Sequence, residues 1–282
     1  MAPNVKIHAL IFDVFGTTVD WYSSVVAEVG RVAEQAGVGA CTFRCATTRS
    51  DLDDDTDGDW GAFAKEWRAG YIRHVQAVGA GTADENLKGL SMDALHRKLL
   101  DGLLDSSAWN HLGQRVDEQG RANLNDVWHR LNGWPDAASA VTQLKQSTLV
   151  IALSNGNMRL LIDIAKHAGL PWDAVLSADL FGSFKPWVEV FYFGDDIDCG
   201  GSDTKVYVGA LKHLSLAPEN CAMVACHLWD LKGAKKAGMQ TIYVRRKAEE
   251  PLGDEDIDGD AVQVGGEVDF VVDNFRELAR LV

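Results

Sequence analysis

Hydrophobic and polar positions follow two different periods along this chain. Between 21 and 131, apart from the tract 38–58, apolar residues recur every three or four positions, as Phe63 and Trp67 do, and no stretch indicates a strand, which predicts an all-helical insert. Outside this segment, short apolar runs alternate with amphipathic helical stretches, which predicts right-handed βαβ units and a parallel sheet. We therefore expect an α/β core domain at 1–20 and 132–282 and an inserted helical domain at 21–131.

The same patterns place the individual elements. Strands of the core are expected at 8–12, 148–153, 174–177, 221–225, 241–244 and 268–272. Core helices are expected at 135–144, 158–168, 206–214, 231–237 and 275–281, and insert helices at 21–36, at 60–78, after the cap residue Ser91 and around 124–131. Loops are expected at 38–58, at 187–202 and in the acidic stretch 249–260.

The first predicted strand ends at a carboxylate. Asp13 directly follows the apolar run 8–12, Gly16 allows a sharp turn, and Thr17 can return its hydroxyl to the carboxylate. Ligands of open α/β sheets bind outside the carboxyl ends of the strands, so Asp13 is a candidate site residue. On this segment alone, a helix-capping aspartate explains the pattern equally well.

Charge and composition narrow the class of partner. A net charge of −14 and a pI near 4.9 argue against a general affinity for nucleic acid or for an anionic membrane. No apolar run approaches the roughly 18 residues of a membrane span, and the first strand comes too early for a signal peptide, so we expect a cytoplasmic protein. The five cysteines have no zinc-like spacing and are expected to be free thiols.

Polar residues follow several of the predicted strands or their loops in a fixed order. They form four groups: Asp13 to Thr17, Ser154 to Asn157, Lys185 with Pro186, and His227 to Asp230. Each group is a weak signal alone, because Ser-Asn-Gly is ordinary turn chemistry and Lys-Pro is common. Since parallel strands bring their carboxyl ends to one edge of the sheet, we expect the four groups to share one crevice.

These groups resemble the motifs of the haloacid dehalogenase (HAD) superfamily, and in particular of its type II L-2-haloacid dehalogenases. The likeness is carried by the stretches 12–21, 153–157, 165–172, 176–178 and 184–186, and by 63–71 in the helical insert. It implies a HAD-like Rossmannoid α/β core, in which a parallel sheet carries the site, with an inserted all-helical cap domain. It also implies a small-molecule 2-haloacid substrate and a possible homodimer.

One position separates this subgroup from the phosphatases of the superfamily. A phosphatase needs a second aspartate two residues after the nucleophile to protonate the leaving group, and further carboxylates to hold Mg²⁺. This chain has Phe15 at that position, and Asp230 is the sole acidic residue from 224 to 230. A halide leaves without a proton, so these residues favour a reaction without a metal or another cofactor.

The resemblance implies a role for each candidate residue. Asp13 attacks C2 of the substrate and displaces halide with inversion, and water then attacks the aspartyl ester with help from Asp230. Thr17 and Lys185 orient Asp13, and the Lys185 ammonium keeps it ionised. The residues expected to bind substrate or halide are Phe15, Arg68, Ser154, Asn155, His227 and Trp229.

Some of these residues also have a simpler interpretation. Without the family likeness, Arg68 is equally well explained as a solvent-facing charge on a helix. His227 stands where the type II pattern has Asn or His, and it fits a structural histidine somewhat better than a catalytic base. Cys226 is more simply a small buried filler than a nucleophile.

The tracts 38–58 and 187–202 interrupt the family pattern. Removing the second tract would join Pro186 to Asp203, so the tracts are either surface loops or translated introns, which sequencing the transcript would decide. The second tract also leaves two candidates, Phe191 and Tyr207, for the position six residues after the lysine in the family pattern.

We therefore expect a metal-independent hydrolase that converts short (S)-2-haloalkanoic acids into 2-hydroxy acids. One alternative is a Mg²⁺-dependent phosphatase of the superfamily, which EDTA sensitivity and phosphate release would reveal. The other is a catalytically idle HAD-like protein with a binding or scaffold role, which would fold without ever forming an aspartyl ester.

Overall fold

The chain divides into two compact units. The computed structural model describes residues 6–38, 58–79, 82–87, 89–185, 204–246 and 268–282. The core unit comprises Met1–Asp20 and Leu131–Val282, and the helical unit comprises Trp21–Arg130. This division lies one residue before the second boundary predicted from the sequence. The loops predicted at 38–58, 187–202 and 249–260, and with them Phe191, lie outside the described residues except for Val38 and Gly58.

The core unit is built on a parallel sheet, as the alternation of apolar runs and helices predicts. Six strands pair in parallel in the order β5-β4-β1-β6-β7-β8, so the first strand of the chain is central. The strand bounds are β1 Ala9–Phe12, β4 Leu149–Ser154, β5 Ala174–Ser177, β6 Cys221–Ala225, β7 Gln240–Val244 and β8 Phe270–Val272. The predicted α/β fold is confirmed, and the carboxyl ends of β1, β4, β5 and β6 lie along one edge of the sheet.

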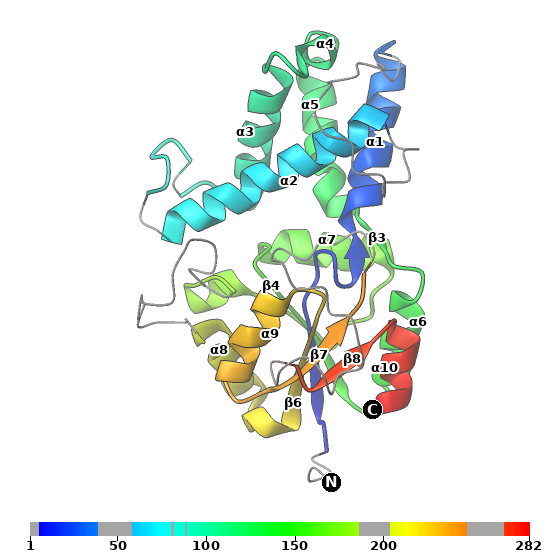
Figure 1. Cartoon of the computed structure of the whole chain (residues 1–282), viewed down its shortest axis with the longest axis vertical. Coiled ribbons are helices and arrows are strands. Elements are labelled where there is room, and N and C mark those ends of the chain that lie inside the picture. Colours follow the sequence, from blue (N-terminus) through cyan, green and yellow to red (C-terminus); the bar gives the residue numbers. More distant parts are fainter. Residues whose placement is uncertain (1–5, 39–57, 80–81, 88, 186–203, 247–267) are drawn as a thin grey trace. The chain divides into compact units, whose positions relative to one another are not determined.

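β1 is central because all of its side chains are apolar and fully buried. On one face, Ile11 and Met223 belong to a cluster that includes Tyr207 of α8 and Leu231 of α9. On the other face, Phe12 packs edge-on against Phe275 of α10, which lies beside α6 (Figure 1). The core helices are α6 Ala137–Leu144, α7 Met158–Ala168, α8 Lys205–Leu214, α9 Leu228–Lys236 and α10 Phe275–Leu281, with short 3-10 turns at Ala178–Phe181 and Pro218–Asn220.

A two-stranded ribbon lies where the chain leaves and re-enters the core unit. β2 (Val19–Asp20) pairs antiparallel with β3 (Asn132–Gly133), and the backbone of Trp134 continues the contact by donating to the Thr18 carbonyl at 3.1 Å. Two-residue strands carry no usable hydrophobic period, so the hydrophobic pattern does not predict them. The ribbon joins the two chain segments that flank the helical unit.

The described residues of the helical unit form helices and turns without a strand, as predicted. Its interior is aromatic: Trp67 packs edge-on against Trp128, and Trp128 stacks on His96 with 4.5 Å between ring centroids. The helices are α1 Trp21–Gln35, α2 Gly58–Gly79, α3 Met92–Leu104, α4 Asn110–Gly113, α5 Glu118–Asn125 and the 3-10 helix η1 Asp126–Arg130. Among the described residues of both units, no helix is long and apolar enough to cross a membrane.

Two predicted helices differ from the structure. The stretch expected around 124–131 is divided between the end of α5 and the 3-10 turn η1. Helix α9 begins at Leu228, three residues before the predicted start, so Trp229 and Asp230 lie in its first turn and not in a loop. An aspartate in the first turn is favourable because the helix dipole is positive there.

Candidate active site

The segment after β1 forms a tight turn that presents Asp13 at the edge of the sheet. The backbone N–H of Asp13 donates to the Val224 carbonyl at 3.0 Å, so the backbone that carries the carboxylate is held in place beside β6. Gly16 has φ of 77°, a conformation that a residue with a Cβ rarely adopts. The Gly16 carbonyl accepts the indole N–H of Trp134 at 2.7 Å, which holds the turn in place.

Two buried carboxylates share one ammonium group in this site. Lys185 Nζ donates to Asp13 Oδ1 at 2.9 Å and to Asp230 Oδ2 at 2.5 Å. All three residues are almost completely buried, with 3%, 4% and 0% of their surfaces exposed, respectively. Opposite charges buried in this way stabilise one another only as a set, because removing one member leaves another unpaired. The structure thus brings together Asp13, Lys185 and Asp230 from widely separated motifs, as the sequence predicts.

The remaining oxygen of Asp230 is bonded to a tyrosine. Tyr207, fully buried on α8, donates its hydroxyl to Asp230 Oδ1 at 2.6 Å. Of the two candidates for the position after the lysine, Tyr207 therefore contacts the site, whereas Phe191 lies outside the described residues. Asp230 is bonded through both of its oxygens, which fixes the carboxylate and limits how it can turn toward a substrate or water.

The environment pushes the two carboxyl pKa values in opposite directions. Burial alone would raise the pKa of Asp13, but the Lys185 ammonium and the His227 imidazole outweigh it and hold the pKa well below the ordinary value. For Asp230, burial outweighs the Lys185 ammonium and, together with the nearby Asp13 charge, raises the pKa. Lys185 lies closer to Asp230, but Asp13 is also contacted by the Thr17 hydroxyl and the His227 ring, and these contacts favour its ionised form.

Thr17 and His227 both contact the second oxygen of Asp13. The Thr17 hydroxyl lies 2.8 Å from Asp13 Oδ2, and His227 Nδ1 lies 3.1 Å from the same atom. The Thr17 oxygen in turn accepts the backbone N–H of Cys226 at 3.0 Å, which orients the hydroxyl toward the carboxylate. His227 is thus brought into direct contact with the Asp13 carboxylate. Cys226 is buried, and its Sγ lies against Thr17 and His227.

Asn155 clamps the backbone of Lys185. Its Oδ1 accepts the Lys185 N–H at 2.6 Å, and its Nδ2 donates to the Lys185 carbonyl at 3.0 Å. Both ends of the amide are therefore bonded to protein, although the sequence resemblance assigned Asn155 to substrate or halide. This geometry supports a different role for Asn155, in which it fixes the residue that carries the ammonium group.

Three further predicted residues lie around the cluster. Phe15 is buried, and its ring approaches Gly156 so closely that a Cβ there would lie 3.2 Å from it. Ser154 is buried at the end of β4, and Trp229 stacks on His227 with 5.0 Å between ring centroids. The core unit therefore brings together nine of the ten predicted site residues. Arg68 is the exception.

Arg68 lies on α2 and belongs to the helical unit. Its guanidinium lies over the ring of Tyr71 at 5.2 Å and over that of Trp21 at 5.6 Å, and the residue is half-buried. Stacking on two aromatic rings holds the guanidinium in a defined place and differs from the solvent-facing alternative. The assignment of Arg68 to the halide remains a prediction.

Arg246, whose side chain is largely covered, contacts the turn after β1 and was not identified from the sequence. Arg246, which follows β7, donates to the Thr17 carbonyl at 3.0 Å and to Asp136 at 3.0 and 3.1 Å. Its guanidinium also lies over the ring of Phe275 at 4.4 Å. An arginine two residues after the end of β7 was the available signal, because a cation near a strand end is rarely buried without a partner.

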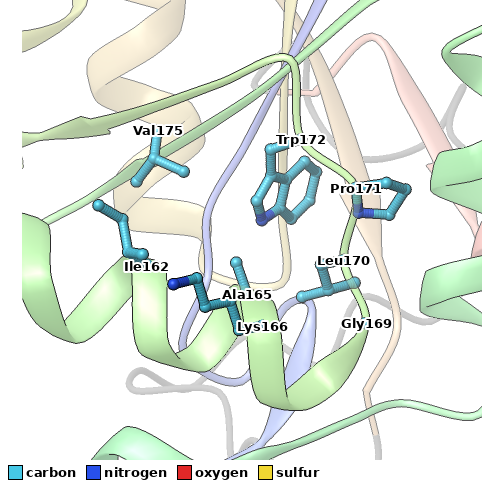
Figure 2. Close-up of a pocket in the computed structure, with 8 residues that line it drawn as sticks. All are labelled: Ile162, Ala165, Lys166, Gly169, Leu170, Pro171, Trp172 and Val175. Atoms are coloured by element: carbon cyan, nitrogen blue, oxygen red, sulfur yellow. The ribbon is translucent and has the colours of Figure 1, made fainter.

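Neither a metal cluster nor the surface pocket of Figure 2 coincides with these residues. Within the part of the chain that the structure describes, no three His, Cys, Asp or Glu side chains are grouped to hold a metal ion. A pocket of about 340 Å³ lies in the core unit between α7 and the segment that leads into β5, with Trp172 and Lys166 among its lining residues (Figure 2). That segment precedes β5, whereas Asp13 and its partners follow the carboxyl ends of strands. The pocket therefore contains none of the candidate site residues.

Replacing Tyr207 by phenylalanine tests whether the Asp230 network contributes to stability. The change leaves Asp230 Oδ1 buried without its donor, so the free energy of unfolding is expected to fall by about 1.5–3 kcal/mol. Urea unfolding at neutral pH, followed by tryptophan fluorescence, measures this loss. An unchanged midpoint would show that the hydroxyl contact contributes little to the folded state.

Comparison with known proteins gives consistent results for most of the chain. The family model described as haloacid dehalogenase-like hydrolase matches residues 7–238. The (S)-2-haloacid dehalogenase 4A of Burkholderia cepacia is 25% identical over 249 residues, which cover 87% of this chain and 86% of that protein.

Solved structures resemble this chain over nearly its full length. An L-2-haloacid dehalogenase is 30% identical with a TM-score of 0.71, and the match covers 98% of this chain and 99% of that one. A defluorinating L-2-haloacid dehalogenase is 28% identical with a TM-score of 0.72, and the match covers 98% and 94% of the two chains. The similarity therefore extends over both the core unit and the helical unit.

Proposed function

This chain belongs to the haloacid dehalogenase-like hydrolases, and we propose on this basis that it cleaves the carbon–halogen bond of short (S)-2-haloalkanoic acids. The family resemblance seen in the sequence is thereby confirmed. Relatives that carry the name (S)-2-haloacid dehalogenase support the substrate class. The products are a 2-hydroxy acid, a halide ion and a proton.

The observation that carries the proposal is the state of Asp13. A carboxylate is a nucleophile only when it is ionised, and Lys185 and His227 hold the Asp13 pKa well below its ordinary value despite burial. Lys185, Thr17 and His227 also fix the carboxylate from three directions, which reduces the entropy lost when it attacks. Asp13 then displaces halide from C2 and forms an aspartyl ester, with inversion at C2.

The pocket walls proposed for this reaction are apolar. Phe15 stands two residues after Asp13, where it excludes water and cannot deliver a proton or bind a metal ion. Halide requires neither, because it departs as a stable anion. Ser154 at the end of β4 and Trp229 in the first turn of α9 are proposed to contact the substrate, and Arg68 of the helical unit is proposed to receive the halide as a cation.

The ester is proposed to be hydrolysed at the Asp13 carbonyl. Asp230, with its raised pKa, is the group best suited to take the proton of the attacking water. We assign Asn155 to positioning Lys185, because the oxygen and the nitrogen of its side-chain amide both form hydrogen bonds with the Lys185 backbone. Thr17 keeps its predicted role of orienting Asp13.

A Mg²⁺-dependent phosphatase is the second function considered from the sequence. A HAD-hydrolase of Bacillus subtilis bound to magnesium has a TM-score of 0.58 at 13% identity, which demonstrates a shared fold alone. In this chain, Lys185 occupies the space between Asp13 and Asp230 where a cation would need both carboxylates. An ammonium at that place opposes Mg²⁺ by charge repulsion.

The test measures halide release from L- and D-2-chloropropionate and from monochloroacetate in the presence of EDTA. We expect halide from the L-enantiomer and from chloroacetate, with no loss on metal removal. A parallel assay with p-nitrophenyl phosphate and Mg²⁺ detects the alternative activity. Phosphate release without halide release would refute the dehalogenase proposal, and absence of both would favour the catalytically idle alternative.

A further inference from the structure

The turn after β1 is held from outside at three successive carbonyls. Trp134 donates its indole N–H to the Gly16 carbonyl at 2.7 Å and its backbone N–H to the Thr18 carbonyl at 3.1 Å. Between these two, the Thr17 carbonyl accepts a hydrogen bond from Nε of Arg246 at 3.0 Å. The conformation of the turn therefore depends on two residues, Trp134 and Arg246, that lie far from it in the sequence.

The Arg246 side chain is itself fixed in place. Its Nη1 donates to both oxygens of Asp136, at 3.0 and 3.1 Å. Its guanidinium lies 4.4 Å from the centroid of the Phe275 ring and 5.1 Å from that of the Trp134 ring, and the side chain is only 6% exposed. A planar guanidinium held by a carboxylate and two rings has little freedom to turn, so Nε presents its proton at a defined point.

Asp136 ties this arginine to the last helix of the chain. Its Oδ2 also accepts the backbone N–H of Phe275, the first residue of α10, at 2.7 Å. The first N–H groups of a helix have no acceptor within the helix, so the carboxylate satisfies one of them while it pairs with Arg246. The donor at the Thr17 carbonyl is thus anchored to the packed start of α10.

Thr17 connects this support to the nucleophile. The residue is fully buried, its carbonyl bonds Arg246, and its hydroxyl lies 2.8 Å from Asp13 Oδ2. A buried carbonyl that loses its donor is costly, so the peptide is expected to rotate toward another donor and to move the side chains of the turn. A misplacement of about 1 Å at a reacting group slows a reaction by roughly 10²-fold.

We propose that Arg246 is a positioning residue for the nucleophile: by holding the Thr17 carbonyl, it sets the direction from which Asp13 attacks C2, an inference that rests on the proposed function. Trp134 acts in the same way through the Gly16 carbonyl. Since Nε and Nη1 of Arg246 both bond protein groups, its loss is expected to slow ester formation and to leave the affinity for substrate nearly unchanged.

Three variants and one matched control test the proposal. Arg246→Met removes the donors and keeps an unbranched apolar stem, whereas Arg246→Lys keeps the charge but cannot reproduce a fork that bonds two groups. Trp134→Phe removes the donor to the Gly16 carbonyl and keeps a ring beside the guanidinium. Arg245→Met is the control, because it removes the same charge from the adjacent residue, whose 39% exposed guanidinium pairs with Asp273 at 2.6 Å.

The measurement is halide release from L-2-chloropropionate in a single turnover, with saturating enzyme in excess over substrate. An unfolded fraction lowers the amount of active enzyme but not this rate constant, so a purely structural role does not change it. We expect Arg246→Met and Arg246→Lys to be slower by about 10- to 10²-fold and Trp134→Phe by about tenfold, with KM in steady state within about threefold of the wild type. Arg245→Met is expected to stay within about twofold in both quantities.

Several results would overturn the proposal. A wild-type single-turnover rate in Arg246→Met would mean that Arg246 contributes to stability alone, and a wild-type rate in Arg246→Lys would mean that its charge acts without the hydrogen bond. A raised KM at an unchanged rate would mean that Arg246 binds substrate through Nη2, which has no hydrogen-bond partner among the described residues.

Two further comparisons keep the test decisive. If Arg246→Met does not fold, Arg246→Lys and Trp134→Phe carry the same comparison against Arg245→Met. An active wild type with equally fast variants refutes this inference alone, whereas a wild type that releases no halide refutes the proposed function as well.

Discussion

Replacing Asp13 by asparagine is expected to abolish turnover of L-2-chloropropionate, with a fall in rate of at least about 10⁴-fold. The amide nitrogen and oxygen are neutral and cannot displace halide, so the ester does not form. The fold is expected to survive, because Asp230 still pairs with Lys185 at 2.5 Å. Halide release and the thermal unfolding midpoint, measured on the same preparation, separate loss of chemistry from loss of structure.

Asp179→Asn provides a matched control for this experiment. Asp179 is exposed and also follows a strand of the core unit, yet it makes no contact with the Asp13 cluster. Its substitution is expected to leave halide release within about twofold of the wild type, as for a surface site remote from the reaction. A fully active Asp13→Asn protein would remove the nucleophile assignment and, with it, the ester mechanism.

Replacing Lys185 by methionine is expected to cause the largest loss of stability. The change leaves Asp13 and Asp230 buried without their shared cation, and breaking a buried ion pair costs about 3–5 kcal/mol. Lys212→Met, at an exposed position on α8, is the control and is expected to change the free energy of unfolding by less than about 1 kcal/mol. Urea unfolding of both variants measures the difference.

The loss in Lys185→Met is expected to depend on pH with a definite sign. In the wild type, the pKa of Asp13 is lowered, so its carboxylate stabilises the fold above the ordinary aspartate pKa of 3.8, and this contribution is lost as pH falls. Without the ammonium, burial raises the pKa of both carboxyls, so the variant loses stability as pH rises. The destabilisation relative to wild type should therefore grow between about pH 4 and about pH 8. A pH-independent difference would contradict the assigned electrostatics.

The sequence was sufficient for the sheet and for the gathering of its strand ends. Uninterrupted apolar runs marked the buried strands, and the polar groups that follow these strands or their loops identified Asp13, Lys185 and Asp230. These predictions succeeded because a parallel sheet places all its carboxyl ends at one edge whatever the loops between them do.

Contacts that depend on side-chain direction were beyond the sequence. Asn155 bonds the backbone of Lys185, and nothing in its own motif indicates that partner. Arg246 reaches the Thr17 carbonyl from the end of another strand, and His227 reaches one particular oxygen of Asp13. Such pairings are decided by sheet register and helix starts, which local patterns place only to within a few residues.

The central position of β1 also determines the order in which the chain can assemble. Ala9 pairs with Leu149 on one side and with Cys221 on the other, so β1 is synthesised long before either of the strands that pair with it. Closing such long loops is slow, and an unpaired apolar strand is exposed to aggregation meanwhile. The β2–β3 ribbon reduces the loop that must close before β1 pairs with β4. Once the inserted helices fold, the ribbon pairs Val19 with Gly133, and only a short effective loop separates β1 from β4. Early pairing of β2 with β3 would thus hold β1 near β4 while the rest of the sheet forms.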